Sequence, residues 1–191
     1  YNGSIVVSGG GASNINVAAS GALLASTDIT TQPTPSSSAC FNQAVSALSV
    51  VASGGDLSYQ WYSNSSASNS GGAPINGEIA ASFLPPTNSA GTRYYYCVVS
   101  GACGNATSNV STVVTHTAVE VPGAIFSSAA CENVGITYQK TTCREGTCYW
   151  QNSVNGVSTE NSNNTYTVAA TTVYLRTYNS ETQCWSDAIS D

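Results

Sequence analysis

The sequence predicts an all-β protein made of two small tandem domains behind an N-terminal β arm. Only 7% of its 191 residues are charged, against roughly 25% in typical globular proteins, while the hydrophobic share is an ordinary 41%. Short alternating runs of Val, Ile, Tyr and Thr, bounded by Gly, Ser and Asn, are typical of strands. Two segments also carry the same parts in the same order: a Trp strand, a polar connection, a Tyr-containing strand and a Cys.

Charge and cysteine content narrow the classes of function. The net charge is −6 with only four basic residues, which excludes the electrostatic footprint that nucleic acid or an anionic membrane requires. No apolar run approaches the roughly 20 residues needed to span a bilayer. Seven cysteines favour an oxidising compartment. We therefore expect a mature, secreted protein of the cell surface, with no nucleic-acid partner and no membrane insertion.

Residues 1–30 form the predicted N-terminal arm. Two strand-like stretches, 4–7 and 14–19, are separated by the flexible Gly9-Gly10-Gly11, and apolar residues alternate in the second stretch. Two interpretations stay open: an extra edge strand or leader of its own domain, and a strand donated to another subunit. The residues expected to carry polymerisation are Ile5, Val6, Val7, Ile15, Val17, Leu23 and Leu24.

Residues 31–117 form the first predicted domain. Trp61 is expected in its core, and Tyr95 stands two residues before Cys97, a spacing typical of the tyrosine corner of immunoglobulin folds. The expected elements are a strand at 48–52, a turn at 53–55, the Trp strand at 57–62, a polar loop at 64–76, the Tyr strand at 94–99 and a last strand at 110–115.

Residues 118–191 form the second predicted domain, which repeats this order of parts but ends early. Twelve residues run from Cys103 to Thr115 in the first domain, whereas only seven follow Cys184 in the second. We expect the last strand of the second domain to be incomplete. An incomplete edge leaves backbone N–H and C=O groups unpaired, so another strand should fill it, and the arm is the obvious candidate.

The motifs resemble a known group of proteins. Residues 57–64 and 92–99 resemble the immunoglobulin-like repeats of large secreted and surface proteins of the Bacteroidota, including gliding-associated adhesins. Residues 149–153, with 174–180 and 184–186, look like a second type of such repeat. The resemblance covers roughly residues 31–190 and leaves the arm outside. It implies tandem immunoglobulin-like β-sandwich domains that serve as spacers and adhesive modules.

The cysteines suggest a disulfide framework. Parallel positions in the two domains suggest the bridges Cys40–Cys103 and Cys131–Cys184, which leaves Cys143 and Cys148 to clip a local hairpin. Cys97 remains, most simply as a buried thiol against Trp61, with an intersubunit disulfide as the alternative. The spacings match no zinc finger or ribbon, and the acidic residues are scattered, so we expect no metal and no cofactor.

An enzymatic function finds no support in the sequence. The single histidine, His116, ends a strand, and no nucleophile elbow accompanies it. Five sequons are candidate glycosylation sites, a number expected by chance in a chain this rich in Asn, Ser and Thr. They are at Asn2, Asn64, Asn105, Asn109 and Asn163.

Two functions are consistent with these observations. The first is a structural subunit of an extracellular, fimbria-like filament, in which each copy donates its N-terminal strand to a neighbouring identical subunit. The second is an adhesion or glycan-binding module of a long multi-repeat cell-surface protein, whose last strand is supplied by downstream residues. Aromatic side chains on the strands could stack against surface glycans in that case, although most aromatic residues in such strands belong to the core.

Overall fold

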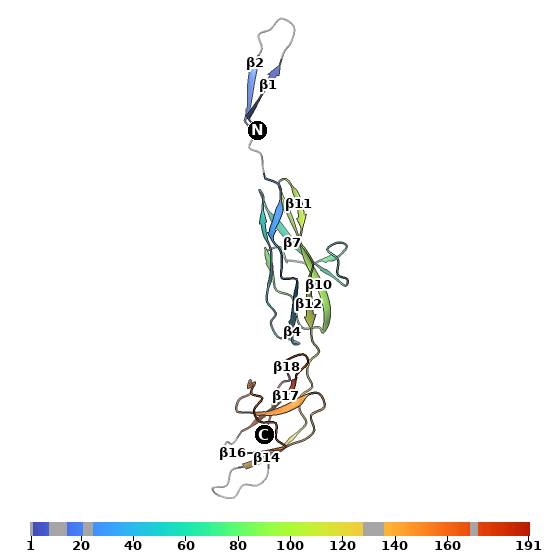
Figure 1. Ribbon diagram of the computed structural model, residues 1–191, viewed down its shortest axis with the longest axis vertical. Coiled ribbons are helices and arrows are strands. Elements are labelled where there is room, and N and C mark those ends of the chain that lie inside the picture. The colour runs from blue at the N-terminus through green and yellow to red at the C-terminus, as the bar shows by residue number, and fades with distance from the viewer. Residues whose placement is uncertain (1, 8–14, 21–24, 128–135, 169–171) are drawn as a thin grey trace. The chain divides into compact units, whose positions relative to one another are not determined.

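The computed structural model describes residues 2–7, 15–20, 25–127, 136–168 and 172–191. Every regular element in these ranges is a β-strand, from β1 to β19, and none is a helix (Figure 1). The prediction of an all-β protein is therefore confirmed. The chain divides into two compact units. The first unit is Tyr1–Pro35 with Leu48–Phe83 and Tyr94–Ser111, and the second is Ser36–Ala47 with Leu84–Arg93 and Thr112–Asp191.

The arm forms a two-stranded antiparallel ribbon. Strand β1 (Asn2–Val7) pairs with β2 (Ile15–Ser20), and the register places Ile5 opposite Val17 and Val7 opposite Ile15. The sequence predicts these two strands but not their pairing with each other. Leu23 and Leu24 lie outside the described residues.

Strands of the first unit form antiparallel pairs on two sides of a core. On one side β3 (Asp28–Thr31) pairs with β6 (Val51–Ser53), and β5 (Leu48–Ser49) pairs with β9 (Ser82–Phe83). On the other side β7 (Ser58–Asn64) pairs with β8 (Ala73–Pro74) and β10 (Gly91–Gly101), and β10 pairs with β11 (Gly104–Thr107). The single strand predicted at 48–52 is split into β5 and β6 because its two halves pair with different neighbours.

Aromatic side chains join these two sides of the first unit. Trp61 of β7 is completely buried, and its ring centroid lies 5.6 Å from that of Phe83 on β9. The Phe83 ring in turn lies 5.2 Å from the ring of Tyr95 on β10. The Trp61 indole N–H donates to the carbonyl of Ala80, so its polar atom is satisfied inside the core. A buried Trp on one strand, packed across to the opposite sheet beside a Tyr–x–Cys strand, is the arrangement of an immunoglobulin-like sandwich.

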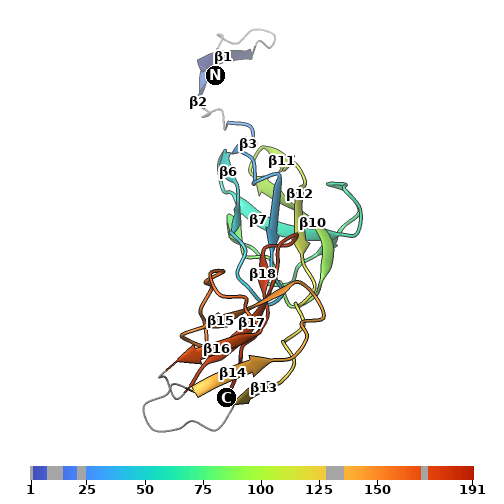
Figure 2. The same ribbon diagram turned by 60° about the horizontal axis from the view of Figure 1, so that its bottom comes forward.

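The second unit contains two further sheets, whose strands β13 to β18 are labelled in Figure 2. β4 (Ser36–Ala39) pairs in parallel with β12 (Ser111–Thr115). One sheet has the order β13 (Ile125–Ser127), β14 (Ile136–Lys140), β16 (Thr165–Val168). In the other, β17 (Tyr174–Asn179) pairs with β15 (Thr147–Gln151) on one side and with β18 (Cys184–Trp185) and β19 (Ile189–Ser190) on the other.

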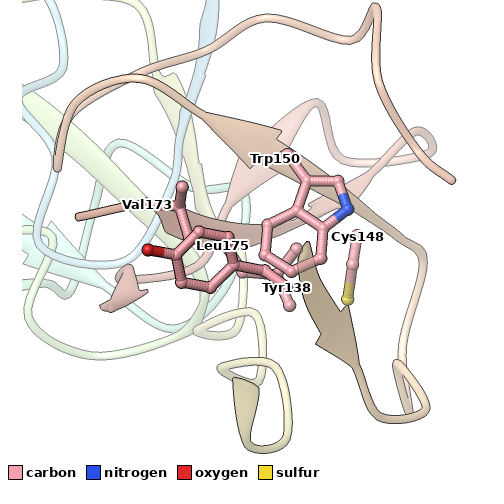
Figure 3. Close-up of a cluster of buried hydrophobic side chains, with 5 residues drawn as sticks. All are labelled: Tyr138, Cys148, Trp150, Val173 and Leu175. Atoms are coloured by element: carbon pink, nitrogen blue, oxygen red, sulfur yellow. The ribbon is translucent and has the colours of Figure 1, made fainter. Parts of the chain in front are cut away.

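A buried cluster holds these two sheets together (Figure 3). Tyr138 comes from β14, and its ring lies 6.5 Å from that of Trp150 on β15. Leu175 of β17 is completely buried beside them. The Trp150 indole N–H donates to the carbonyl of Asn163, as that of Trp61 does to Ala80 in the first unit. The repeated Trp strand seen in the sequence therefore has the same structural role twice.

One buried serine in each unit repeats the same set of hydrogen bonds. The Oγ of Ser108 accepts the N–H of Cys97, its own N–H donates to the Cys97 carbonyl, and its hydroxyl donates to Asn109. Ser186 makes the equivalent bonds with Thr177 and Asp187. In both cases a new strand, β12 or β19, begins three residues later.

The sequence predicts an unpaired edge beside the Tyr-containing strand of the second predicted domain, which is β17, and the structure differs from this expectation. β18 pairs with Tyr178 and Asn179, and β19 pairs with Tyr174 and Leu175, so the edge of β17 is occupied at both ends. The last strand is short, since β19 has two residues and its counterpart β12 has five. The side of β17 is therefore not the open edge, and an added strand would have to lie outside β18 and β19.

The disulfides partly correct the predicted pairing. Cys143 is joined to Cys148, as the sequence predicts, but Cys40 is joined to Cys184 across a separation of 144 residues. The bridges Cys40–Cys103 and Cys131–Cys184 are therefore wrong. The prediction assumed that each domain pairs its own cysteines, whereas the segment 36–47 belongs to the same compact unit as Cys184. Cys131 lies outside the described residues, and Cys103 is exposed. The predicted ranges 1–30, 31–117 and 118–191 stay a prediction.

Candidate functional site

Three features stand out as candidate sites: the N-terminal ribbon, the outer edge of β18 and β19, and an aromatic cluster with a small cavity. The ribbon is a sheet of only two strands, and no other described strand pairs with it. An isolated two-stranded hairpin is at best marginally stable in water. Its register also pairs Ile5 with Val17 and Val7 with Ile15, so apolar residues stand at opposed positions. Such a ribbon gains stability when another sheet covers or extends it.

The edges of the β15–β17 sheet are not equally accessible to a partner strand. On the outer side of β15 the Lys140 ammonium donates to the carbonyl of Cys148, and the N–H of Trp150 donates to the carbonyl of Asn161. Both backbone groups are therefore satisfied, and a lysine on an edge is a device that blocks strand addition. On the opposite edge no described strand pairs with the outer side of β19. The corresponding side of β12 is covered by β4.

Cys97 is a buried thiol, as the sequence predicts. It is completely buried, lies opposite Trp61 in the β7–β10 register and is not in a disulfide. Burial raises the pKa of the Cys97 thiol to about 11, and a backbone hydrogen bond to Gln60 opposes this in part. The thiol is therefore protonated and unreactive at neutral pH.

The sequons differ in how available their amides are. The Nδ2 of Asn64, the atom that would carry a sugar, donates to the carbonyls of Ser68 and Ser70 and organises its loop. Asn105, Asn109 and Asn163 are exposed. The side chain of Asn2 lies outside the description. Sequence reasoning gave all five equal weight, because the local hydrogen bonds of Asn64 cannot be seen in a sequon.

Half-buried aromatic side chains gather on the outward face of the β15–β17 sheet. The ring of Trp185 lies 4.8 Å from that of Tyr178 and 5.8 Å from that of Tyr149, centroid to centroid. The guanidinium carbon of Arg176 lies 5.5 Å from the centre of the Trp185 ring, which is a cation–π contact. These residues follow from strand alternation, because Leu175 and Thr177 face the core and their neighbours face outward. Sequence reasoning missed them as a group.

Arg176 is fixed in place by backbone carbonyls. Its Nε donates to Ser186 and its Nη1 to Gly156, at 2.8 and 2.9 Å. Burial lowers the pKa of Arg176, while the negative charge of Asp187 acts to raise it. No residue in the described ranges accepts a hydrogen bond from Nη2. The guanidinium is therefore oriented by the protein and keeps donors for another group.

A cavity of about 200 Å³ lies beside this arginine, and all its lining residues belong to the second unit. Cys40 and Cys184, which form one of its walls, are joined by the disulfide. The other lining residues combine amides, a carboxylate, a guanidinium, hydroxyls and aromatic rings. They are Phe41, Asn42, Gln43, Thr117, Ala118, Val119, Arg176, Trp185, Ser186 and Asp187.

No group of three or more His, Cys, Asp or Glu side chains in the described ranges is placed to hold a metal ion. His116 is half-buried, and its backbone N–H donates to Ala39 at the end of the β4–β12 pair, a structural role. Among the described residues no helix is long and apolar enough to cross a membrane.

Comparison with known proteins gives a family match over part of the chain and a distant likeness to a solved structure. Residues 25–117 match the model of a family described as a domain of unknown function, DUF8696. No curated protein matches the sequence. Among solved structures the chain is similar to hemolin, an insect immune protein whose domain arrangement has been discussed for homophilic adhesion, with 12% identity and a TM-score of 0.34. That likeness covers 87% of this chain and 49% of hemolin, so the chain spans about half of that protein's length.

Proposed function

We propose that this protein is a secreted structural subunit that assembles head to tail with identical copies through its N-terminal ribbon. The strands β1 and β2 of one copy extend the sheet of the next along the outer side of β18 and β19. Main-chain hydrogen bonds supply affinity, and alternate side chains set the register. A contact between two different surfaces of the same chain does not close on itself, so it builds a fibre.

The observation that carries this proposal is the two-stranded ribbon. Its sheet ends at two strands, and Ile5 with Val17 and Val7 with Ile15 occupy directly paired positions. Ordering such a ribbon costs conformational entropy that two strands hardly repay. An extended sheet in a neighbouring copy supplies the missing stabilisation.

The repeat within the chain supports the acceptor edge. Ser108 and Ser186 are equivalent, and the strand that follows each by three residues is β12 in one case and β19 in the other. β12 has β4 beside it in parallel, and the same side of β19 has no partner among the described strands. The donated strand would therefore take the place of β4, which moves the predicted acceptor one strand outward from β17. The two disulfides support an extracellular location.

A matched pair of variants on β2 tests the assembly. Val17→Asp puts a charge at a paired apolar position, and Asn16→Asp puts the same charge on the adjacent residue, which belongs to the other face. We expect the unmodified chain and Asn16→Asp to form filaments in electron micrographs and large species in light scattering. Val17→Asp should stay monomeric. Monomeric behaviour of the unmodified chain under oxidising conditions would refute the proposal.

The second candidate function is an adhesion or glycan-binding module of a longer cell-surface protein. The outward-facing rings of Tyr149, Tyr178 and Trp185 beside Arg176 favour it, because aromatic faces and fixed polar donors are what a sugar surface requires. Such a module would be monomeric with or without residues 2–20. The light-scattering experiment therefore separates the two candidates.

A further inference from the structure

The geometry points to the cavity beside Arg176 as a binding site for one neutral pyranose residue at the end of a glycan. This inference deepens the adhesion candidate and rests on it, and it does not depend on assembly through the ribbon. The site is lined by residues of three parts of the second unit: 40–43, 117–119, and Arg176 together with 184–187.

The size of the cavity selects the ligand. Its volume of about 200 Å³ is below the roughly 300 Å³ at which pockets begin to enclose drug-sized ligands. The volume of a single sugar ring is of the same order as this cavity, whereas a longer oligosaccharide would have to extend outward into solvent. The terminal residue of a glycan meets both conditions.

The polar lining suits hydroxyl groups. A pyranose presents hydroxyls that both donate and accept, and the cavity offers the amides of Asn42 and Gln43, the carboxylate of Asp187 and the guanidinium of Arg176. Trp185 supplies an apolar face against which the axial C–H groups of a sugar ring can pack. Few polar groups around one aromatic anchor give orientation and specificity together.

The charges argue for a neutral ligand. Asp187 lies close enough to Arg176 to influence it electrostatically, so the single cation of the site is opposed by a carboxylate. A phosphate or sulfate would meet that carboxylate with no second cation in the lining. A neutral polyol is not repelled by the carboxylate, and its hydroxyls can form hydrogen bonds with both Asp187 and Arg176.

The segments that line the cavity are fixed by a disulfide and by backbone hydrogen bonds within the protein. The Cys40–Cys184 disulfide ties two of the three segments, and the N–H of Gln43 closes a turn on the carbonyl of Cys40. Asn42 adopts a left-handed backbone with φ of 57°, which asparagine tolerates, and its N–H donates to the carbonyl of Thr87. A site fixed in this way loses little entropy on binding.

The test is a titration of the full isotope-labelled chain with methyl glycosides of glucose, galactose, mannose and N-acetylglucosamine, with methyl glucuronide as the charged comparison. The chain has three tryptophans, and Trp61 and Trp150 are buried. We expect at least one neutral glycoside to shift the indole N–H resonance of Trp185 while those of the other two stay in place. The association state is recorded in the same samples.

Matched variants localise the binding. Asp187→Asn removes a charge from the lining, and we expect it to weaken binding about tenfold, the size of one charge-assisted hydrogen bond. Glu181→Gln makes the same change at an exposed position outside the lining and should leave affinity unchanged. Trp185→Phe keeps an aromatic ring and should weaken binding less than Asp187→Asn does.

Each negative outcome has its own meaning. Unchanged affinity in Asp187→Asn, or shifts confined to the first unit, would overturn this site and leave the adhesion function standing. Stronger binding of the glucuronide would overturn the neutral class. If no glycoside shifts any resonance, this site fails, and the adhesion and filament candidates are judged by the light-scattering data.

Discussion

Replacing Ser186 by alanine removes one hydroxyl from the edge of the second unit. Ser186 is 2% exposed, and its Oγ accepts the N–H of Thr177 at 2.9 Å. In the alanine variant that N–H is buried without a partner, which costs about 1–3 kcal/mol. The same hydroxyl donates to the carbonyl of Asp187, an exposed residue whose carbonyl can bond to water instead. We therefore expect a loss of about 2 kcal/mol in the free energy of unfolding.

Native-state hydrogen exchange measures this loss within one unit. A chain of two compact units need not unfold in one step, so a single transition midpoint would mix their stabilities. The amide of Thr177 should exchange roughly 30-fold faster in Ser186→Ala, which corresponds to about 2 kcal/mol. The amide of Leu175, completely buried on the same strand, should follow if the whole unit is weakened.

Two comparisons decide whether the hydrogen bond is the cause. Ser108→Ala should produce an equal loss in the first unit, read at the amide of Cys97, because its bonds are the same. Ser180→Ala changes an exposed serine of the β17–β18 connection and should change stability little. A loss below about 0.5 kcal/mol for Ser186→Ala would show that a water molecule or a backbone shift replaces the hydroxyl, and the reasoning would be refuted.

Three further predictions concern the cysteines and the sequons. Replacing Cys40 and Cys184 together by serine should destabilise the chain by about 5 kcal/mol on the chain-entropy model, as measured by denaturant unfolding, and non-reducing peptide maps of the unmodified protein should contain the linked pair. Cys97 should resist alkylation at pH 8 until the chain is unfolded. Relative to Cys97→Ala, folding stability should fall as the pH rises from 9 to about 11, because the unfolded state releases the thiol proton first and the folded state keeps it. In a glycosylating host, intact mass and peptide mapping should find sugar on Asn105 and none on Asn64, whose Nδ2 already donates two hydrogen bonds.

The sequence predicts best the features that depend on strand alternation. Trp61 and Cys97 stand at apolar positions of alternating strands, and the structure buries both completely. The disulfide between Cys143 and Cys148 is also predictable from the sequence, because the two residues are only 5 positions apart. The pair Cys40–Cys184 has no such local signal. Its two members meet only because the segment after β4 belongs to the same compact unit as β18.

Short strands explain the other differences. β18 and β19 have two residues each and are separated by residues 186–188, so no alternating run marks them as one edge. The pairing of β1 with β2 was equally hidden, since an apolar alternating stretch predicts a strand and not its neighbour. The aromatic cluster was overlooked because Tyr149 and Tyr178 look like core residues until the opposite face is known to be the buried one.

The two serines connect the fold to both proposals. Each one interrupts the pairing beside a Tyr strand because its hydroxyl oxygen accepts a backbone N–H of that strand, and so the chain can leave and rejoin the edge. At Ser186 this interruption also presents the serine carbonyl to the Nε of Arg176, which fixes that side chain toward Trp185. Three residues further on, the same interruption starts β19, beside which a donated strand would lie. Ser186→Ala should therefore lower both the stability of the second unit and its affinity for glycosides. Val17→Asp should stop assembly and leave glycoside binding unchanged.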